Sequence, residues 1–188
     1  MKEETILEDK KEDYHLKVVL EDEDILWYMN GQPIMHTNQH DGPWKCYQIE
    51  HSGMSGKDNN ILVGGLGFGY TSQQCTEFGT TTTVEILPSV VDMYNAVYPD
   101  FPLDIVVDDV CDYLKNTEKT FDYILFQLDF AGFDLGYRYC IDSNKQIYTE
   151  EFMKMVKDKL NPKGVFVTEG LTETDIESPV KIMFEKSG

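Results

Sequence analysis

A glycine-rich segment is the first feature of this chain whose residue types and spacing could bind a ligand. Gly65, Gly67 and Gly69 follow the apolar run Ile61–Val63 and precede a stretch that could be helical. Glycine lets the backbone turn tightly and lets a ligand approach without a Cβ in the way. The pattern is G-x-G-x-G, with Tyr70 where a dinucleotide fingerprint has its last glycine, and no basic residue lies within it. A nucleoside without phosphate, such as the adenosine of S-adenosylmethionine, therefore fits this segment better than NAD.

Three carboxylates could complete such a site. Glu85, Asp109 and Asp129 each fall where an expected strand ends. In parallel sheets, ligands bind at the edge where the carboxyl ends of the strands meet. A carboxylate at Glu85 can accept hydrogen bonds from both hydroxyls of a ribose. Asp109 can reach an adenine amino group, and it can equally cap a helix that begins at Val110.

The elements that would position these residues alternate between strand and helix. Apolar and β-branched runs predict strands near residues 61–63, 81–86, 103–107, 122–128 and 164–168. Helical spacing predicts helices within residues 70–78, 88–98, 110–114 and 149–160. The alternation predicts an α/β fold, with a parallel sheet covered by helices on both faces.

A smaller element precedes this domain. Residues 14–50 have a strand-like pattern with the hairpin-type dipeptide Asn30-Gly31, which predicts antiparallel β-hairpins. Residues 1–13 are mostly charged, and we expect a frayed or weakly helical acidic leader there. The expected domains are therefore residues 1–13, 14–50 and 51–188.

The composition excludes several classes of function. The chain has 188 residues with 16 Lys and Arg against 34 Asp and Glu, a formal net charge of −18, and its single arginine is Arg138. Nucleic-acid binding needs a basic face, and an anionic membrane surface would repel this chain, so we expect neither partner. A small cationic substrate would be attracted. No apolar run approaches a membrane span and no signal peptide is visible, so we expect a cytoplasmic protein.

Cysteine and histidine spacing predicts no metal site. His36 and His40 are four apart, but Pro33 and Gly42 argue against a helix that would bring them together. No CxxC pair occurs, so neither a zinc site nor a disulfide framework is indicated. The four cysteines are expected to be reduced structural thiols: Cys46, Cys75, Cys111 and Cys140.

Several motifs occur in the order seen in one family, and Tyr47-Gln48 precedes them. They are Ile61–Gly69, Val84–Pro88, Asp108–Val110, Phe121–Leu125, Ile147–Phe152 and Leu160–Gly164. With these motifs and the N-terminal hairpins, the chain resembles the spermidine synthases over roughly residues 14–170. Those enzymes are polyamine aminopropyltransferases of the class I methyltransferase superfamily. The resemblance implies a Rossmann-like sheet, a cationic amine substrate, and S-adenosylmethionine or its decarboxylated form as cofactor.

The resemblance also implies roles for individual residues. The three glycines would line the methionine and ribose side of the cofactor, with Glu85 on the ribose and Asp109 on the adenine. Gln48 would lie near the sulfonium. Three further residues would serve the reaction: Asp129 as the residue nearest the catalytic carboxylate, Tyr47 beside the amine, and Tyr148 in the substrate pocket. The family forms dimers or tetramers, and apolar Trp27, Tyr28 and Ile34 on the hairpins favour a homodimer.

Two departures from the family pattern leave the reaction open. Phe68 stands where the family usually has the Asp that holds the aminopropyl amine, so Asp134 or Glu169 would have to replace it. Gln127-Leu-Asp129-Phe-Ala stands where the family usually reads Asp-x-x-Asp-Pro. Aminopropyl transfer is the preferred hypothesis. The alternatives are a methyltransferase, or a catalytically degraded relative that binds the cofactor and has a regulatory or assembly role.

Overall fold

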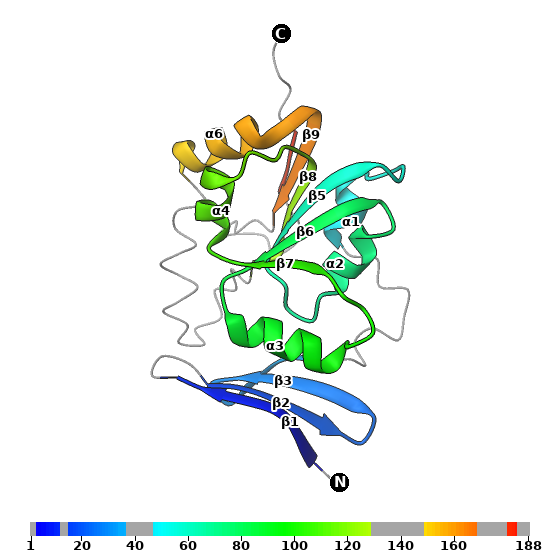
Figure 1. The fold of residues 1–188 in the computed structure, drawn as a ribbon, viewed down its shortest axis with the longest axis vertical. Helices are drawn as coiled ribbons and strands as arrows, with labels where there is room; N and C mark the ends of the chain where they lie inside the picture. Colours follow the sequence, from blue (N-terminus) through cyan, green and yellow to red (C-terminus); the bar gives the residue numbers. More distant parts are fainter. Residues whose placement is uncertain (1–2, 12–14, 37–46, 129–148, 169–179, 184–188) are drawn as a thin grey trace.

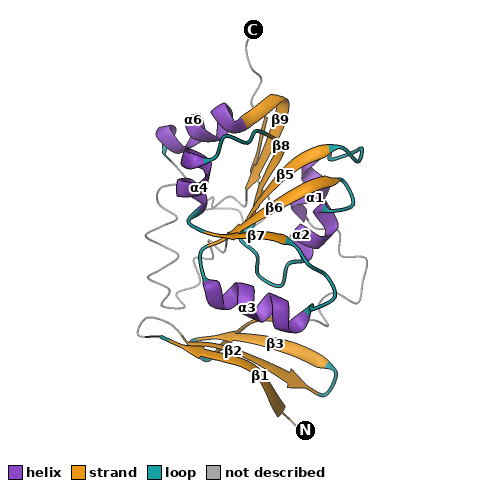
Figure 2. Cartoon of the chain, viewed as in Figure 1, coloured by secondary structure: helices purple, strands orange, loops and turns teal. Residues whose placement is uncertain are grey.

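A computed structural model describes residues 3–11, 15–36, 47–128, 149–168 and 180–183, which form two sheets and their helices (Figures 1 and 2). The N-terminal sheet is antiparallel throughout, in the order β1-β2-β3-β4. Its strands are β1 (Glu3–Lys10), β2 (His15–Glu21), β3 (Asp24–Met29) and β4 (Gln32–His36). The hairpin element predicted from the sequence is thus confirmed.

The first strand corrects one expectation. The charged segment predicted as a frayed or weakly helical leader is instead β1, which pairs with β2 along its length. Charges on neighbouring strands hold it there: Lys17 forms an ion pair with Glu3, and His15 Nε2 lies 2.7 Å from Glu8 Oε1. Opposite charges across a strand pair stabilise a sheet. A segment without apolar alternation can therefore form a strand when a neighbouring strand supplies its partners.

The larger sheet has the order β10-β9-β8-β5-β6-β7. Five strands are parallel, and β10 pairs antiparallel with β9. The strands are β5 (Asn59–Gly64), β6 (Gly79–Glu85), β7 (Asp104–Val107), β8 (Phe121–Phe126), β9 (Leu160–Thr168) and β10 (Val180–Met183). The alternation of strand and helix predicted this α/β sheet, and the prediction is confirmed.

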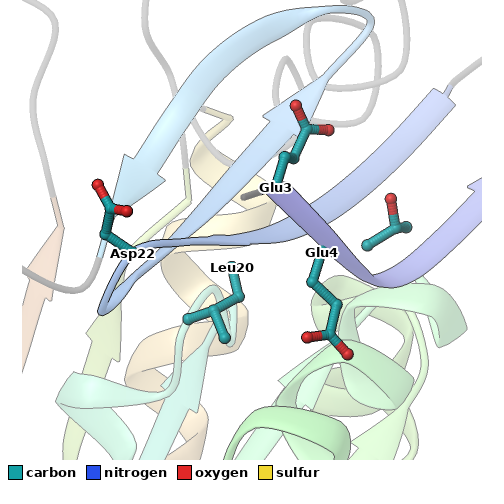
Figure 3. A pocket seen from close by; sticks show the side chains of 5 residues that line it. Glu3, Glu4, Leu20 and Asp22 are labelled. Carbon is teal, nitrogen blue, oxygen red and sulfur yellow. The ribbon is translucent and has the colours of Figure 1, made fainter. Parts of the chain in front are cut away.

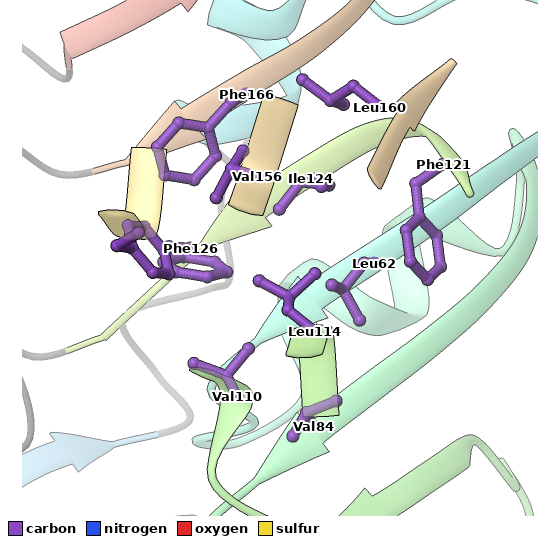
Figure 4. Close-up of a cluster of buried hydrophobic side chains, with 11 residues drawn as sticks. Leu62, Val84, Val110, Leu114, Phe121, Ile124, Phe126, Val156, Leu160 and Phe166 are labelled. Carbon is purple, nitrogen blue, oxygen red and sulfur yellow. The ribbon is translucent and has the colours of Figure 1, made fainter. Parts of the chain in front are cut away.

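Helices cover both faces of the larger sheet (Figure 1). They are α1 (Tyr47–Ser52), α2 (Tyr70–Cys75), α3 (Pro88–Val97), α4 (Val110–Asn116) and α6 (Glu150–Lys159). Helix α1 lies where the sequence pattern predicted continued strand. On one face, α4 and α6 bury apolar side chains against the strands (Figure 4). On the other face, Ile49 of α1 and Cys75 of α2 pack against Ile61 and Leu125.

The N-terminal sheet packs on the rest of the chain through α3, which lies between the two sheets in Figure 1. Leu16 and Val18 of β2 lie opposite Met29 and Trp27 of β3, so all four point to the same face. These side chains form one buried cluster with Met93 and other residues of α3. Trp27 is only 8% exposed, so it is not the free apolar surface from which we predicted a dimer. The side chain of Ile34 lies outside the described set.

Candidate cofactor site

The glycine-rich loop connects β5 to α2 in a conformation that requires glycine. Gly65, Gly67 and Gly69 have φ values of +88°, +52° and +78°, a region that side-chain-bearing residues rarely adopt. The loop is held by backbone hydrogen bonds from Gly65 N to Val84 O (2.9 Å) and from Gly69 N to Leu66 O (2.7 Å). The predicted tight turn at the end of the first parallel strand is thus present.

Two of these glycines are also required by neighbouring protein atoms. A Cβ on Gly65 would lie 2.4 Å from the carbonyl oxygen of Gln127, and one on Gly69 would lie 2.2 Å from a ring carbon of Tyr94. Both distances are far below van der Waals contact. The sequence reasoning explained these glycines by the approach of a ligand, whereas the structure shows protein groups close to both positions.

Glu85 is the carboxylate most tightly integrated with the loop. It ends β6 and is 8% exposed. Its Oε2 accepts a hydrogen bond from Leu66 N in the glycine-rich loop, and its Oε1 accepts one from Leu87 N at the start of α3, both at 2.9 Å. Burial raises the pKa of Glu85, and the backbone hydrogen bonds oppose this. The backbone N–H group of Ile86 also interacts with this carboxylate, and a carboxylate has about four acceptor sites in total, so some capacity for a ligand hydroxyl remains.

Asp109 follows β7 and is the N-cap of α4. Its Oδ1 accepts hydrogen bonds from Cys111 N (2.7 Å) and Asp112 N (3.4 Å), which confirms the capping interpretation. Burial, together with the carboxylate of Asp109, raises the pKa of Cys111 to about 12. The thiol is therefore protonated at neutral pH and is no nucleophile.

The cap predicts a stability effect. Asp109→Ala leaves two helix N–H groups without their acceptor and should lower the free energy of unfolding by about 1 kcal/mol. Asp109→Asn should stay close to the unchanged protein, because Asn caps helices equally well. Urea unfolding followed by circular dichroism measures both. Equal loss in the two variants would show that the cap does not account for the effect.

Several buried polar side chains lie in α1, in α2 and at the end of β9. Gln48 in the first turn of α1 and Thr71 in α2 are each 2% exposed, and Thr168 at the end of β9 is 5% exposed. The Thr71 hydroxyl donates a hydrogen bond to Oε1 of Gln127, which follows β8. The sequence reasoning named Gln48 but missed Thr71. Gln127 stands directly after the apolar run of β8, and that position was the signal that it ends a strand beside the loop.

The remaining candidates have no described geometry. Helix α1 begins at Tyr47, but the side chain of this residue lies outside the described set. Four others lie wholly outside the described residues: Asp129, Asp134, Tyr148 and Glu169. The structure therefore joins the glycine-rich loop to Glu85 and places Asp109 at the end of the neighbouring strand, while the roles predicted for the site residues stay predictions.

Phe68 points away from solvent rather than into an open site. It is 1% exposed, and its ring packs edge-on against Trp27 with the ring centroids 6.0 Å apart. Tyr70 contacts the same ring at 6.1 Å. Phe68 therefore joins the loop to the N-terminal sheet.

A separate hollow lies on the N-terminal sheet and is lined by Glu3, Glu4, Thr5, Leu20 and Asp22 (Figure 3). None of the predicted site residues lines it. Among the residues that the structure describes, no three His, Cys, Asp or Glu side chains gather where they could hold a metal ion. Within the same residues, no helix is long and apolar enough to cross a membrane.

Comparison with known proteins connects this arrangement to one group of enzymes. The chain is 25% identical over 135 residues to a polyamine aminopropyltransferase of Aeropyrum pernix, a match that covers 63% of this chain and 40% of that protein. It is 27% identical over 173 residues to a polyamine aminopropyltransferase of Pyrobaculum calidifontis, covering 85% and 58%. The structure matches the spermidine synthase of Thermotoga maritima with a TM-score of 0.60 and 16% identity, covering 88% and 56%. The chain is thus similar in sequence to polyamine aminopropyltransferases and similar in fold to spermidine synthase structures.

The chain differs from these relatives in extent. It spans about half the length of the curated relatives it matches. A spermidine synthase in complex with the transition state analogue AdoDATO matches with a TM-score of 0.60 and 17% identity, so the likeness in structure concerns the fold. No family model matches the chain. The fold is an α/β sheet with five parallel strands, preceded by a small antiparallel sheet, as predicted.

Proposed function

We propose that this chain binds an adenosine-bearing sulfonium, S-adenosylmethionine or its decarboxylated form, and transfers an aminopropyl group from it to an amine. One observation carries the cofactor half of the proposal. The Glu85 carboxylate is buried at the end of β6, is bonded to the glycine-rich loop, and keeps acceptor capacity for ribose hydroxyls. The transferase half rests on the relatives that carry the name polyamine aminopropyltransferase.

Neighbouring residues fit an adenine ring. Ile86 follows Glu85 in the chain, and Val107 at the end of β7 pairs with Glu85 across the sheet. Their apolar side chains are 45% and 50% exposed. Burying them beneath a flat heterocycle would be favourable. The Asp109 carboxylate accepts hydrogen bonds from two backbone N–H groups of α4 and from the Cys111 thiol, and a carboxylate has further acceptor capacity for an adenine amino group. Gln48 would lie toward the sulfonium.

The chemistry requires alignment and removal of a proton. The bound sulfonium supplies an electrophilic carbon and a neutral thioether leaving group. The acceptor amine is mostly protonated near neutral pH, since its pKa is about 10. Asp129 follows Gln127 and Leu128 at the end of β8, so it would be the base that takes this proton. Tyr47, Tyr148 and Asp134 would form the amine pocket around it, and the acidic surface would attract the cationic amine.

A methyl transfer is the second candidate, and Phe68 favours it. The glycine-rich loop carries no acidic side chain that could hold an aminopropyl ammonium, because Phe68 occupies the position and is buried against Trp27. A methyltransferase does not need that contact in the loop. The same fold and the same adenosine site would serve both reactions.

The deciding assay uses the full chain with decarboxylated S-adenosylmethionine and putrescine, and measures methylthioadenosine. Asp129→Asn should keep methylthioadenosine affinity and lower the rate roughly 100-fold or more, because the amine loses its base. A parallel reaction with S-adenosylmethionine measures S-adenosylhomocysteine. If only S-adenosylhomocysteine forms, the reaction is methyl transfer and the proposal of aminopropyl transfer is wrong. Binding without either product, with cadaverine and spermidine also tested, would indicate the degraded relative.

We also propose that the chain forms a homodimer, as the resembling family does. The side chain of Trp27 is buried within the chain, so the dimer interface would use other residues. Light scattering across a range of concentrations measures the particle mass. A particle of 21.7 kDa at every concentration would contradict the proposal.

A further inference from the structure

Both side chains carried by the glycine-rich loop are buried in the cluster that joins the N-terminal sheet to α3. Between Gly65 and Gly69 only Leu66 and Phe68 have side chains, and they are 2% and 1% exposed. They belong to the cluster that contains the inner face of β2 and β3 and one face of α3. On this side, the loop is therefore supported by an element that is remote in sequence.

Trp27 makes the described ring contact between that sheet and the loop. Its ring meets Phe68 at 73° with the centroids 6.0 Å apart. Such edge-on pairs are favourable beyond the area they bury. Trp27 Nε1 is buried, and in the part of the chain that the structure describes it has no hydrogen-bond acceptor. The indole thus acts here through its shape and its ring contacts.

The opposite side of the loop is held by Glu85. The hydrogen bond from Leu66 N to Glu85 Oε2 joins the same residue whose side chain packs into the cluster. A displacement of Leu66 or Phe68 from the N-terminal sheet would therefore move the amide that Glu85 holds. Glu85 and the N-terminal sheet therefore contact the same short segment of backbone, from Leu66 to Phe68.

We infer that Trp27 is a positioning residue of the cofactor site, which couples docking of the N-terminal sheet to the conformation of the glycine-rich loop. Where it concerns ligand affinity, this inference rests on the proposed function. Coupling between two such events is reciprocal. Loosening the sheet should weaken adenosine binding, and binding should tighten the sheet against the loop.

The test compares three variants of the full chain at a temperature where all are folded. Trp27→Ala removes the ring contact. Trp27→Phe keeps an aromatic ring, and it breaks no hydrogen bond within the described residues because Trp27 Nε1 makes none there. Phe152→Ala is the matched control, since Phe152 is 2% exposed and contacts the rings of Phe126 and Phe166 in a buried cluster that contains neither Trp27 nor Phe68. It removes comparable packing without touching the loop.

The first readout needs no ligand. Hydrogen exchange of the Leu66 and Gly69 amides should become at least tenfold faster in Trp27→Ala, relative to the amides of β8 in the same variant. Trp27→Phe should restore most of the protection, and Phe152→Ala should not accelerate the loop selectively. If the exchange rates of the loop amides change by the same factor as those of the β8 amides in all variants, the inference is wrong.

The second readout is the dissociation constant of methylthioadenosine. It should rise at least tenfold in Trp27→Ala and stay within about threefold of the unchanged protein in Trp27→Phe and Phe152→Ala. If Trp27→Ala and Phe152→Ala weaken methylthioadenosine binding equally, Trp27 has only a general packing role and the inference is wrong. If the unchanged protein binds no methylthioadenosine, the proposed function fails, while the exchange measurement still decides the coupling of loop and sheet.

Discussion

Phe68→Asp should lower the free energy of unfolding by about 4 kcal/mol or more, because it replaces a fully buried ring by a carboxylate. The position is 1% exposed and lies among Leu16, Trp27 and Met93. The new carboxylate would have no described cation beside it and would have to be protonated or solvated by opening the cluster. Restoring the residue that the family usually has would therefore damage the fold instead of creating an ammonium site.

Urea unfolding measures this loss, and Phe101→Asp is the control. Phe101 is 40% exposed, so the same substitution there should cost about 1 kcal/mol or less. Binding of decarboxylated S-adenosylmethionine should not improve in Phe68→Asp. A stable variant with tighter binding would show that position 68 faces the ligand and that the packing against Trp27 is not required.

Glu85→Ala should weaken binding of S-adenosylmethionine and methylthioadenosine at least tenfold. Two hydrogen bonds from the ribose hydroxyls to a charged acceptor are worth roughly 1.5–3 kcal/mol each. The variant also leaves Leu66 N and Leu87 N without their acceptor, so the loop itself should become less stable. Calorimetry at a temperature where the variant is folded measures the affinity. Glu77→Ala removes the same charge from an exposed position and should bind normally.

The same carboxylate predicts a pH dependence. Burial raises the pKa of Glu85 above its ordinary value of 4.5, so the folded chain retains this proton to higher pH than the unfolded chain. Its contribution to stability is therefore present below pH 4.5 and is lost as the pH rises through the raised pKa. Ribose hydroxyls donate to the ionised form, so ligand affinity should increase with pH over that interval and binding should release protons.

Titrations in buffers of different ionisation enthalpy measure the proton release. Glu85→Gln cannot titrate at this position, and it should bind methylthioadenosine weakly with an affinity that no longer changes over the interval. Proton uptake on binding, or an unchanged pH dependence in Glu85→Gln, would show that another group is responsible and that Glu85 does not hold the ribose.

Local patterns in the sequence were sufficient to predict the order of the strands and helices in the larger domain. Apolar and β-branched runs predicted β5 to β9, and helical spacing predicted α2, α3, α4 and α6, because backbone preferences and side-chain periodicity act over a few residues. The same local reasoning explains why Asp109 caps α4 and why Glu85 stands at a strand end. Strand β8 was expected to reach residue 128 and ends at Phe126, which leaves Gln127 free to bond to Thr71.

Only the tertiary structure decided what these residues contact. The charged segment of β1 became a strand because β2 supplies its hydrogen-bond partners and Lys17 pairs with Glu3. Gly69 is glycine partly because Tyr94 approaches it from another helix. No pattern within a few residues encodes such partners.

Phe68 illustrates the division between the two sources of information. The sequence by itself determined that the glycine-rich loop has an aromatic residue in place of an acid. The direction of that side chain depends on Trp27, which is 41 positions earlier in the chain and reaches the loop only after the two sheets have packed. Composition and spacing predicted a cofactor loop, whereas packing between distant segments determined what holds the loop in place. The physical reason is that strand pairing and side-chain burial are long-range, while propensity is local.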